Sequence, residues 1–181
     1  ETEICITGAA PLPAEILAWF RAIGVPLTEG YGMSENCAVL TWANDPKPGC
    51  VGRAATGVEI RIADDGEVLA RGGNVCVGYL GKPEQTAETI DEDGWLHTGD
   101  IGVLDDDGYL KIVDRKKELI ITSGGKNISP ANLEAALKMI PLVGQACAIG
   151  DQRKFISALL VLDPEAAPIW AAAHGKEGMS L

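Results

Sequence analysis

The stretch WLHTGDIGVLDDDGYLKIVDRKKELIIT, residues 95–122, contains two strand patterns and then a change in character. WLHTGDIGVL and YLKIVD flank the turn string DDDG at 105–108, which is typical of antiparallel strands joined by a tight turn. Five of the 15 basic residues then fall within 16 positions: Lys111, Arg115, Lys116, Lys117 and Lys126. This change predicts a domain boundary at Asp114, with domains at 1–113 and 114–181. The basic cluster indicates either an anionic ligand or neutralisation of nearby acids.

The rest of the chain predicts short strands and short helices. Residues 1–40 read as strand EICITG, a helix with apolar residues at helical spacing, and strand VPLTEG, which is a β-α-β pattern. VEIRIA, EVLARG and NVCVGYL predict further strands of a small twisted sheet or partial barrel, with a helix at 83–90. Beyond Asp114 we expect strand ELIIT, a helix at 130–140, strands QACAIGD and ISALLVLD, and a helix at 164–173. The fold class is therefore α/β to α+β.

Composition excludes several classes of protein. The 181 residues carry a formal net charge of −11, which argues against a nucleic-acid partner. No apolar run has the length of a membrane helix. The five cysteines are scattered and never spaced C-x-x-C, so neither a disulfide framework nor a zinc site is indicated, and we expect a cytoplasmic protein. Because the sequence starts inside a strand pattern without a leader, we expect a piece of a longer protein.

Common catalytic motifs are missing from the sequence. It contains neither G-x-x-x-x-G-K-[ST] nor G-x-G-x-x-G after a strand, so a P-loop or dinucleotide fold is not supported. Two histidines, His97 and His174, are too few for a histidine metal site. No G-x-S-x-G string is present, although a Ser/His/Asp triad is not excluded by residue counts.

The string TEGYGMSEN at 28–36 places an aromatic ring, glycines, a hydroxyl and a carboxylate together at a strand end. The ring of Tyr31 is suited to stacking on a base, the Ser34 hydroxyl to a phosphate, and the Glu35 carboxylate to Mg²⁺. A turn around a buried tyrosine would give the same string. In WLHTGD and VDRKKE, Asp100 is suited to accept hydrogen bonds from a ribose diol and Arg115 to donate to the sugar or its phosphate.

In this order, the strings TEGYGMSEN, WLHTGD and VDRKKELIITSGGKNISP, together with GAAPLP at 8–13, resemble the adenylate-forming superfamily. The closest resemblance is to the acyl-CoA synthetases, the long-chain fatty-acid–CoA ligases, and it covers nearly the whole chain. It implies that residues 1–113 end a large AMP-binding domain made of β-α-β units and a small distorted β-barrel. Residues 114–181 would be part of a small, mobile α+β C-terminal domain, with a hinge at Asp114.

The resemblance also implies roles for single residues. Tyr31 matches the aromatic residue that stacks on adenine, and Glu35 the ligand of Mg²⁺. The implied ATP- or AMP-binding residues are Gly8, Ala9, Ala10, Glu29, Gly30, Tyr31, Gly32, Asp100, Ile112 and Arg115. The implied catalytic residues are Ser34, Glu35 and the hinge residue Asp114. The implied CoA-side residues are Gly124, Gly125 and Lys126.

The activity implied by the resemblance has two steps. A fatty acid and ATP give acyl-AMP and pyrophosphate, and CoA then gives acyl-CoA and AMP, with Mg²⁺ as the metal. No string here matches the family's phosphate-binding loop. The string HGKEG around Lys176 does not match the pattern around the family's adenylation lysine either. We therefore expect the chain alone to be inactive. No transmembrane segment is expected, and peripheral membrane contact of the longer protein is left open.

Two short features of the sequence indicate the branch of the family to which the chain is most similar. SGGKNISP at 123–130 resembles the CoA-ligase loop beside the pantetheine arm, and Gly32 stands where acetate-specific relatives have tryptophan, which favours an open pocket for a long acyl chain. Ligases of medium-chain or aromatic acids and fatty-acyl-AMP ligases are alternatives. A non-catalytic nucleotide-binding or interaction fragment is an alternative of another class.

Overall fold

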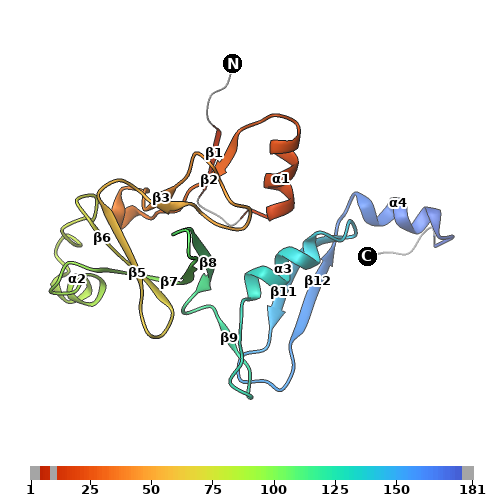
Figure 1. Ribbon diagram of the computed structural model, residues 1–181. Coiled ribbons are helices and arrows are strands. Elements are labelled where there is room, and N and C mark those ends of the chain that lie inside the picture. Colours follow the sequence, from red (N-terminus) through yellow and green to blue (C-terminus); the bar gives the residue numbers. More distant parts are fainter. Residues whose placement is uncertain (1–4, 9–11, 177–181) are drawn as a thin grey trace. The chain divides into compact units, whose positions relative to one another are not determined.

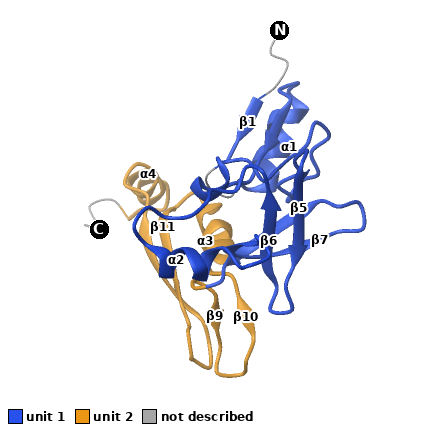
Figure 2. Cartoon of the chain, turned by 90° about the vertical axis from the view of Figure 1, so that its left-hand side faces the viewer, with its two compact units in different colours: residues 1–116 blue, residues 117–181 orange. Residues whose placement is uncertain are grey.

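The computed structural model describes residues 5–8 and 12–176, and the chain divides into two compact units, residues 1–116 and 117–181 (Figure 2). The division falls inside the basic cluster. Asp114, the predicted hinge, therefore lies in the last strand of the first unit.

The first unit opens with two parallel strands joined by a helix (Figure 1). The strands β1, Cys5–Thr7, and β2, Leu27–Glu29, pair in parallel, and the helix α1, Ala14–Ala22, connects them. On α1 the Leu17 side chain is fully buried, whereas Ile16 and Trp19 are exposed. The predicted β-α-β pattern is confirmed.

An antiparallel sheet in the order β5-β6-β7-β8 follows. Its strands are β5 Val58–Ile62, β6 Glu67–Gly72, β7 Leu96–Leu104 and β8 Leu110–Arg115. Val68, Leu96 and Leu110 are completely buried and form part of its core. Three smaller elements precede the sheet: η1 Ser34–Asn36, β3 Thr41–Trp42 and β4 Arg53–Ala54. The predicted small sheet is therefore present and includes the strand pair around the DDDG turn.

One predicted strand, NVCVGYL at 74–80, is wrong. This segment is irregular and leads into the helix α2, Pro83–Thr89. Its backbone donors have partners outside any ladder, because Cys76 N donates to Glu35 O at 2.7 Å and Tyr79 N donates to Thr86 Oγ1 at 2.9 Å. Alternating apolar residues thus form a loop that reaches the Ser34–Asn36 turn.

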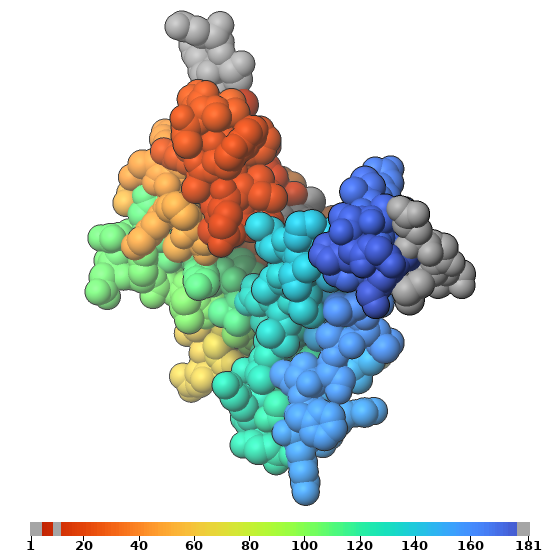
Figure 3. All heavy atoms as spheres, turned by 90° about the vertical axis from the view of Figure 1, so that its right-hand side faces the viewer, coloured from red at the N-terminus to blue at the C-terminus, as the bar shows by residue number. Residues whose placement is uncertain are grey.

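The described part of the second unit, residues 117–176, contains two strand pairs and two helices. In chain order they are β9 Ile120–Ile121, β10 Asn127–Ile128, α3 Pro130–Lys138, β11 Val143–Ile149, β12 Ser157–Leu162 and α4 Ala166–Ala173. Ser129 caps α3, since its Oγ accepts a hydrogen bond from Asn132 N at 3.1 Å. All residues of β12 are exposed, and its blue surface is visible in Figure 3. Among the described residues, no helix is long and apolar enough to span a bilayer.

Candidate functional site

Two predicted nucleotide-binding residues of the first unit, Tyr31 and Arg115, contact a third, Asp100. The Asp100 carboxylate accepts a 2.5 Å hydrogen bond from the Tyr31 hydroxyl on Oδ2, and its Oδ1 lies 2.9 Å from Nε of Arg115. Asp100 on β7 pairs directly with Arg115 on β8, while Tyr31 follows the end of β2. The fold therefore joins the strings TEGYGMSEN, WLHTGD and VDRKKE in one polar network.

The electrostatics of this network suit the recognition of a diol. Burial raises the pKa of the Asp100 carboxyl, and the hydrogen bond from Tyr31 and the charge of Arg115 oppose that rise. Burial and the contact with Asp100 raise the pKa of Tyr31 far above its usual range, so the phenol remains a donor. A carboxylate has about four acceptor positions, and Tyr31 and Arg115 use two of them. Two acceptor positions therefore remain on a side chain that is 6% exposed.

A buried glutamate that sequence reasoning missed lies next to Asp100. Glu67, the first residue of β6, is 6% exposed and accepts hydrogen bonds from Gly99 N at 2.9 Å and Lys116 Nζ at 3.0 Å. The Nδ1 atom of His97 lies 3.3 Å from Glu67 Oε2. Burial would raise the pKa of Glu67, but the hydrogen bonds from Lys116, Gly99 and His97 outweigh it and lower the pKa. The signal in the sequence is a glutamate that leads directly into the apolar run VLA.

The predicted Mg²⁺ ligand belongs to a second network. Glu35 lies in η1, and its Oε1 accepts a 2.7 Å hydrogen bond from the Tyr79 hydroxyl. Ser34, the predicted phosphate ligand, is exposed on the same turn. Tyr79 was missed because its segment reads as a strand. Among the described residues, no group of three or more His, Cys, Asp and Glu side chains could hold a metal ion. One carboxylate together with substrate phosphates is nevertheless a common way to bind Mg²⁺.

The glycines around Tyr31 allow close backbone contacts. A Cβ at Gly8 would lie 3.2 Å from Gly30 O, and a Cβ at Gly32 would lie 2.2 Å from the backbone of Ala38. The contact at Gly32 explains the absence of a side chain without reference to an acyl chain. Gly32 is therefore no longer an argument for an open pocket.

Other predicted residues of the first unit have local roles. Glu29 is buried, its Oε1 accepts a hydrogen bond from Leu12 N at 3.1 Å, and burial raises its pKa despite that bond. Ile112 is half-buried on β8, and Asp114 is buried on the same strand, where its Oδ1 accepts from Arg115 N at 2.7 Å. Ala9 and Ala10 lie outside the described residues.

The predicted CoA-side residues form a turn in the second unit. Gly124, Gly125 and Lys126 join β9 to β10, and Gly125 has a φ of +78°. Thr122 holds the turn, since its carbonyl accepts from Gly125 N at 2.8 Å and its Oγ1 from Lys126 N at 3.2 Å. Of the residues that the structure describes, a Cβ on Gly124 would touch only Thr122, at 4.0 Å from its hydroxyl, so the turn offers an open backbone surface.

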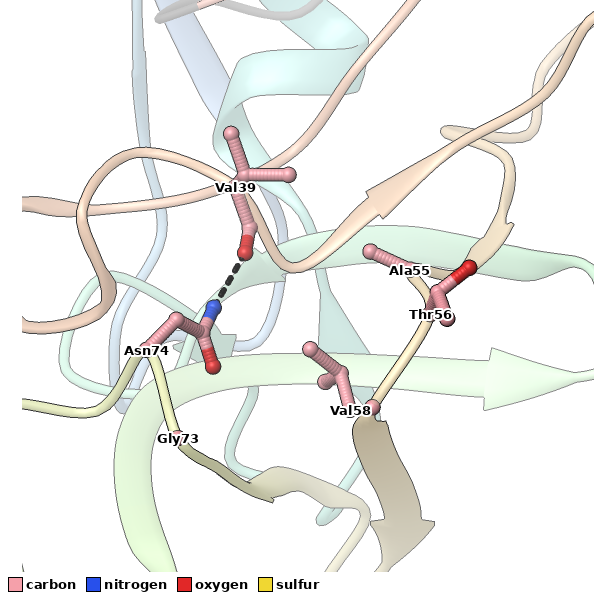
Figure 4. Close-up of a pocket in the computed structure, with 7 residues that line it drawn as sticks. Val39, Ala55, Thr56, Val58, Gly73 and Asn74 are labelled. Carbon is pink, nitrogen blue, oxygen red and sulfur yellow. Dashed lines mark hydrogen bonds between the residues drawn. The ribbon is translucent and has the colours of Figure 1, made fainter.

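A depression of about 420 Å³ lies elsewhere in the first unit. It is lined by Val39, Ala55, Thr56, Gly57, Val58, Gly73 and Asn74 (Figure 4). Asn74 Nδ2 donates to Val39 O at 2.5 Å, while Asn74 Oδ1 is buried with no hydrogen-bond partner among the described residues. None of the predicted site residues lines this depression.

Two family models match the chain. The model described as AMP-binding enzyme matches residues 2–80, and that described as AMP-binding enzyme C-terminal domain matches residues 117–174. The C-terminal match begins at the first residue of the second unit.

Curated relatives are considerably longer than this chain. A putative fatty-acid–CoA ligase, fadD11, of Mycobacterium tuberculosis is 50% identical over 178 residues, which cover 97% of this chain and 31% of the relative. The long-chain-fatty-acid–CoA ligase FadD15 of Mycobacterium bovis is 46% identical over 173 residues, covering 94% of this chain and 29% of the relative. The chain thus spans about a third of the length of these relatives.

Solved structures show the same fold. The o-succinylbenzoate CoA synthetase (MenE) of Bacillus subtilis, in complex with its acyl-adenylate intermediate OSB-AMP, matches with a TM-score of 0.81 and 31% identity. The match covers 98% of this chain and 40% of that protein. The same enzyme with ATP and magnesium ion matches with a TM-score of 0.78 and 32% identity, over 99% of this chain and 42% of that protein.

Proposed function

The chain belongs to the AMP-binding, adenylate-forming enzyme family, and we propose that residues 1–116 supply the adenosine-binding part of a fatty-acid–CoA ligase. The observation that carries this proposal is the contact of Asp100 with both Tyr31 and Arg115. In the proposal, Tyr31 presents its ring to adenine, and Asp100 and Arg115 bind the ribose hydroxyls. The hydroxyl contact with Asp100 fixes the orientation of the Tyr31 ring.

The proposed reaction of the longer protein converts a carboxylic acid into a thioester. A carboxylate oxygen attacks the α-phosphorus of ATP and releases pyrophosphate, and the CoA thiol then displaces AMP. Mg²⁺ would supply positive charge for the phosphate oxygens. Glu35 is the residue proposed to hold the ion, with its carboxylate oriented by Tyr79.

The CoA side of the proposal concerns the second unit. The turn at Gly124–Lys126 combines an open backbone surface with an exposed ammonium group. A flexible pantetheine arm needs such a surface, and the lysine offers a charge partner for a phosphate. The proposed hinge for this unit is Asp114.

A long-chain acid is the proposed substrate. FadD15 of Mycobacterium bovis, 46% identical, is named a long-chain-fatty-acid–CoA ligase, which supports this choice. The proposed location is the cytoplasm, which the free state of Cys5, Cys37, Cys50, Cys76 and Cys147 supports.

The adenosine site is tested by titrating AMP into the purified 181-residue chain by calorimetry. We expect saturable binding that Asp100→Ala weakens by about 10- to 100-fold, because a lost hydrogen bond to a charged group costs ~1.5–3 kcal/mol. Undiminished binding in Asp100→Ala would overturn the proposal. With ATP, Mg²⁺, CoA and a long-chain acid, we expect no turnover by this chain alone, since it spans about a third of its relatives.

The CoA side is tested in a longer ligase that contains this sequence. Gly124→Trp is expected to leave acid-dependent pyrophosphate exchange intact and to suppress acyl-CoA formation. Gly124 is the better site for the substitution than Gly125, whose positive φ would add backbone strain. Equal loss of both half-reactions would exclude a role in thioester formation.

A further inference from the structure

The candidate site depends on an irregular segment of β7. Between the pairs Leu69–His97 and Glu67–Ile101, the register advances by two residues on β6 and by four on β7. The ladder is therefore interrupted at residues 98–100, which end in Asp100. A bulge of this kind redirects a side chain, and the backbone groups that leave the ladder need other partners.

Glu67 supplies partners on both sides of the site. Its Oε1 accepts from Gly99 N at 2.9 Å, and its Oε2 accepts from Lys116 Nζ at 3.0 Å. Gly99 directly precedes Asp100, and Lys116 directly follows Arg115. The backbone of Lys116 also donates to Gly99 O at 2.8 Å. The Glu67 carboxylate therefore connects the two residues that flank the Asp100–Arg115 pair.

The surroundings of Glu67 favour a fixed bridge. The Glu67 side chain is 8% exposed, so water competes little for its carboxylate oxygens. Lys116 is further oriented by Asp65, whose Oδ2 lies 2.5 Å from Nζ. Hydrogen bonds between charged groups are roughly twice as strong as those between neutral groups. The bridge therefore restrains the bulge on the side of β6, where the ladder is interrupted.

The geometry points to Glu67 as a positioning residue that aligns Asp100 and Arg115 for the ribose of a nucleotide. Glu67 acts through Gly99 and Lys116 and does not itself bind the sugar. The inference rests on the proposed function, in which Asp100 and Arg115 bind the ribose hydroxyls.

The test compares two nucleotides that differ only in the ribose hydroxyls. AMP and 2′,3′-dideoxyadenosine monophosphate are titrated into the purified 181-residue chain and into Glu67→Leu and Glu67→Gln. The preference for AMP is the ratio of its affinity to that of the dideoxy nucleotide. We expect this ratio to be about 10-fold lower in Glu67→Leu than in the unmodified chain, while affinity for the dideoxy nucleotide changes less than about twofold. A general loss of structure would weaken the binding of both nucleotides to the same extent.

The milder variant Glu67→Gln and one control variant sharpen this test. Glu67→Gln keeps an acceptor for Gly99 N–H but loses the charge opposite Lys116, so an intermediate preference is expected. Because it is the milder change, it also tests the inference if Glu67→Leu does not fold. Glu59→Gln is the matched control, since it removes a carboxylate that pairs with Arg71 at 2.9 Å in the same sheet, away from the bulge. The preference for AMP should not change in this control.

Amide hydrogen exchange separates this inference from the proposed function. In the chain without nucleotide, we expect exchange at Gly99 to be at least about 10-fold faster in Glu67→Leu and unchanged in Glu59→Gln. Equal affinity of the unmodified chain for both nucleotides would overturn the ribose assignment, and the exchange rates would still decide whether Glu67 holds the bulge. Unchanged exchange at Gly99, or an undiminished preference for AMP in Glu67→Leu and Glu67→Gln, would overturn the positioning role.

Discussion

Two segments of the first unit, the end of β2 and the bulge inside β7, carry predicted nucleotide-binding residues and hold them in different ways. At the end of β2, the segment Glu29–Gly32 is shaped by close backbone contacts, since Gly32 lies directly against the backbone of Ala38. At the bulge of β7, residues 98–100 are held by side chains: Glu67 accepts from Gly99 N, and the Thr98 hydroxyl donates to Val68 O and accepts from Asp100 N. The first arrangement depends on missing side chains and the second on a buried charge.

The two buried glutamates beside these segments show the same contrast. Glu67 faces the ammonium of Lys116, and its hydrogen bonds lower its pKa despite burial. For Glu29, burial outweighs the hydrogen bond from Leu12 N and raises the pKa. Burial of a carboxylate is favourable only where a cation or several donors compensate for lost water. The β7 bulge has this compensation and the end of β2 has little of it.

The largest effect is expected from Gly32→Val at the end of β2. The new Cβ would lie 2.2 Å from the Ala38 backbone, which cannot move without displacing the loop around it. We expect the free energy of unfolding of the first unit to fall by about 3 kcal/mol. Urea denaturation followed by tryptophan fluorescence measures the change.

The control for this variant is Gly73→Ala. No atom of the described residues lies within 4 Å of a Cβ at Gly73, and its φ is one that alanine adopts. We expect stability to stay equal or to rise by about 0.4–1 kcal/mol. If Gly32→Val proved as harmless as Gly73→Ala, the end of β2 would not depend on close backbone contact.

A second prediction compares the sugar contact with the aromatic contact. Arg115→Ala is expected to weaken AMP binding by about 10- to 100-fold, since it removes a charged donor. Tyr31→Phe keeps the ring and removes only the hydrogen bond to Asp100, so a smaller loss is expected. Calorimetric titration of both variants measures these losses. A larger loss in Tyr31→Phe would mean that the phenol, and not the guanidinium, supports Asp100.

The end of β2 was more predictable from the sequence than the β7 bulge. Tyr31, Gly30 and Gly32 lie in one short string, and local spacing was enough to predict a turn with an aromatic residue. Glu67 and Lys116 are 49 positions apart, and their contact depends on the register of three strands. The β-α-β pattern was predictable because strand and helix periods differ. The strand predicted at 74–80 failed because its donors pair with Glu35 and Thr86.

A third prediction concerns the stability supplied by Glu67. Because its pKa in the folded chain lies below the ordinary 4.5, ionised Glu67 stabilises the fold above that pH, and the contribution is lost as the pH falls through the lowered pKa. Lys116 is partly exposed, so Glu67→Gln should cost only about 1 kcal/mol at pH 7. Urea denaturation between pH 2.5 and pH 8 should show a cost that vanishes at the acid end. A cost that does not vary with pH would mean that the charge on Glu67 is unimportant.

The smallest effect, with the opposite sign, is expected from Glu29→Gln. The folded pKa of Glu29 lies above the ordinary 4.5, so the fold is favoured by the protonated form below that pH and loses stability as the pH rises through the raised value. Glutamine keeps an acceptor for Leu12 N–H and carries no charge at any pH. We therefore expect Glu29→Gln to stabilise the first unit by about 0.5 kcal/mol at pH 7 and to have no effect at about pH 3. Urea denaturation at both pH values measures this difference, with Glu92→Gln in the exposed turn after α2 as the control for a general effect of charge. Destabilisation at pH 7 in Glu29→Gln alone would show that the ionised carboxylate is needed at the end of β2, as we infer for Glu67 beside the β7 bulge.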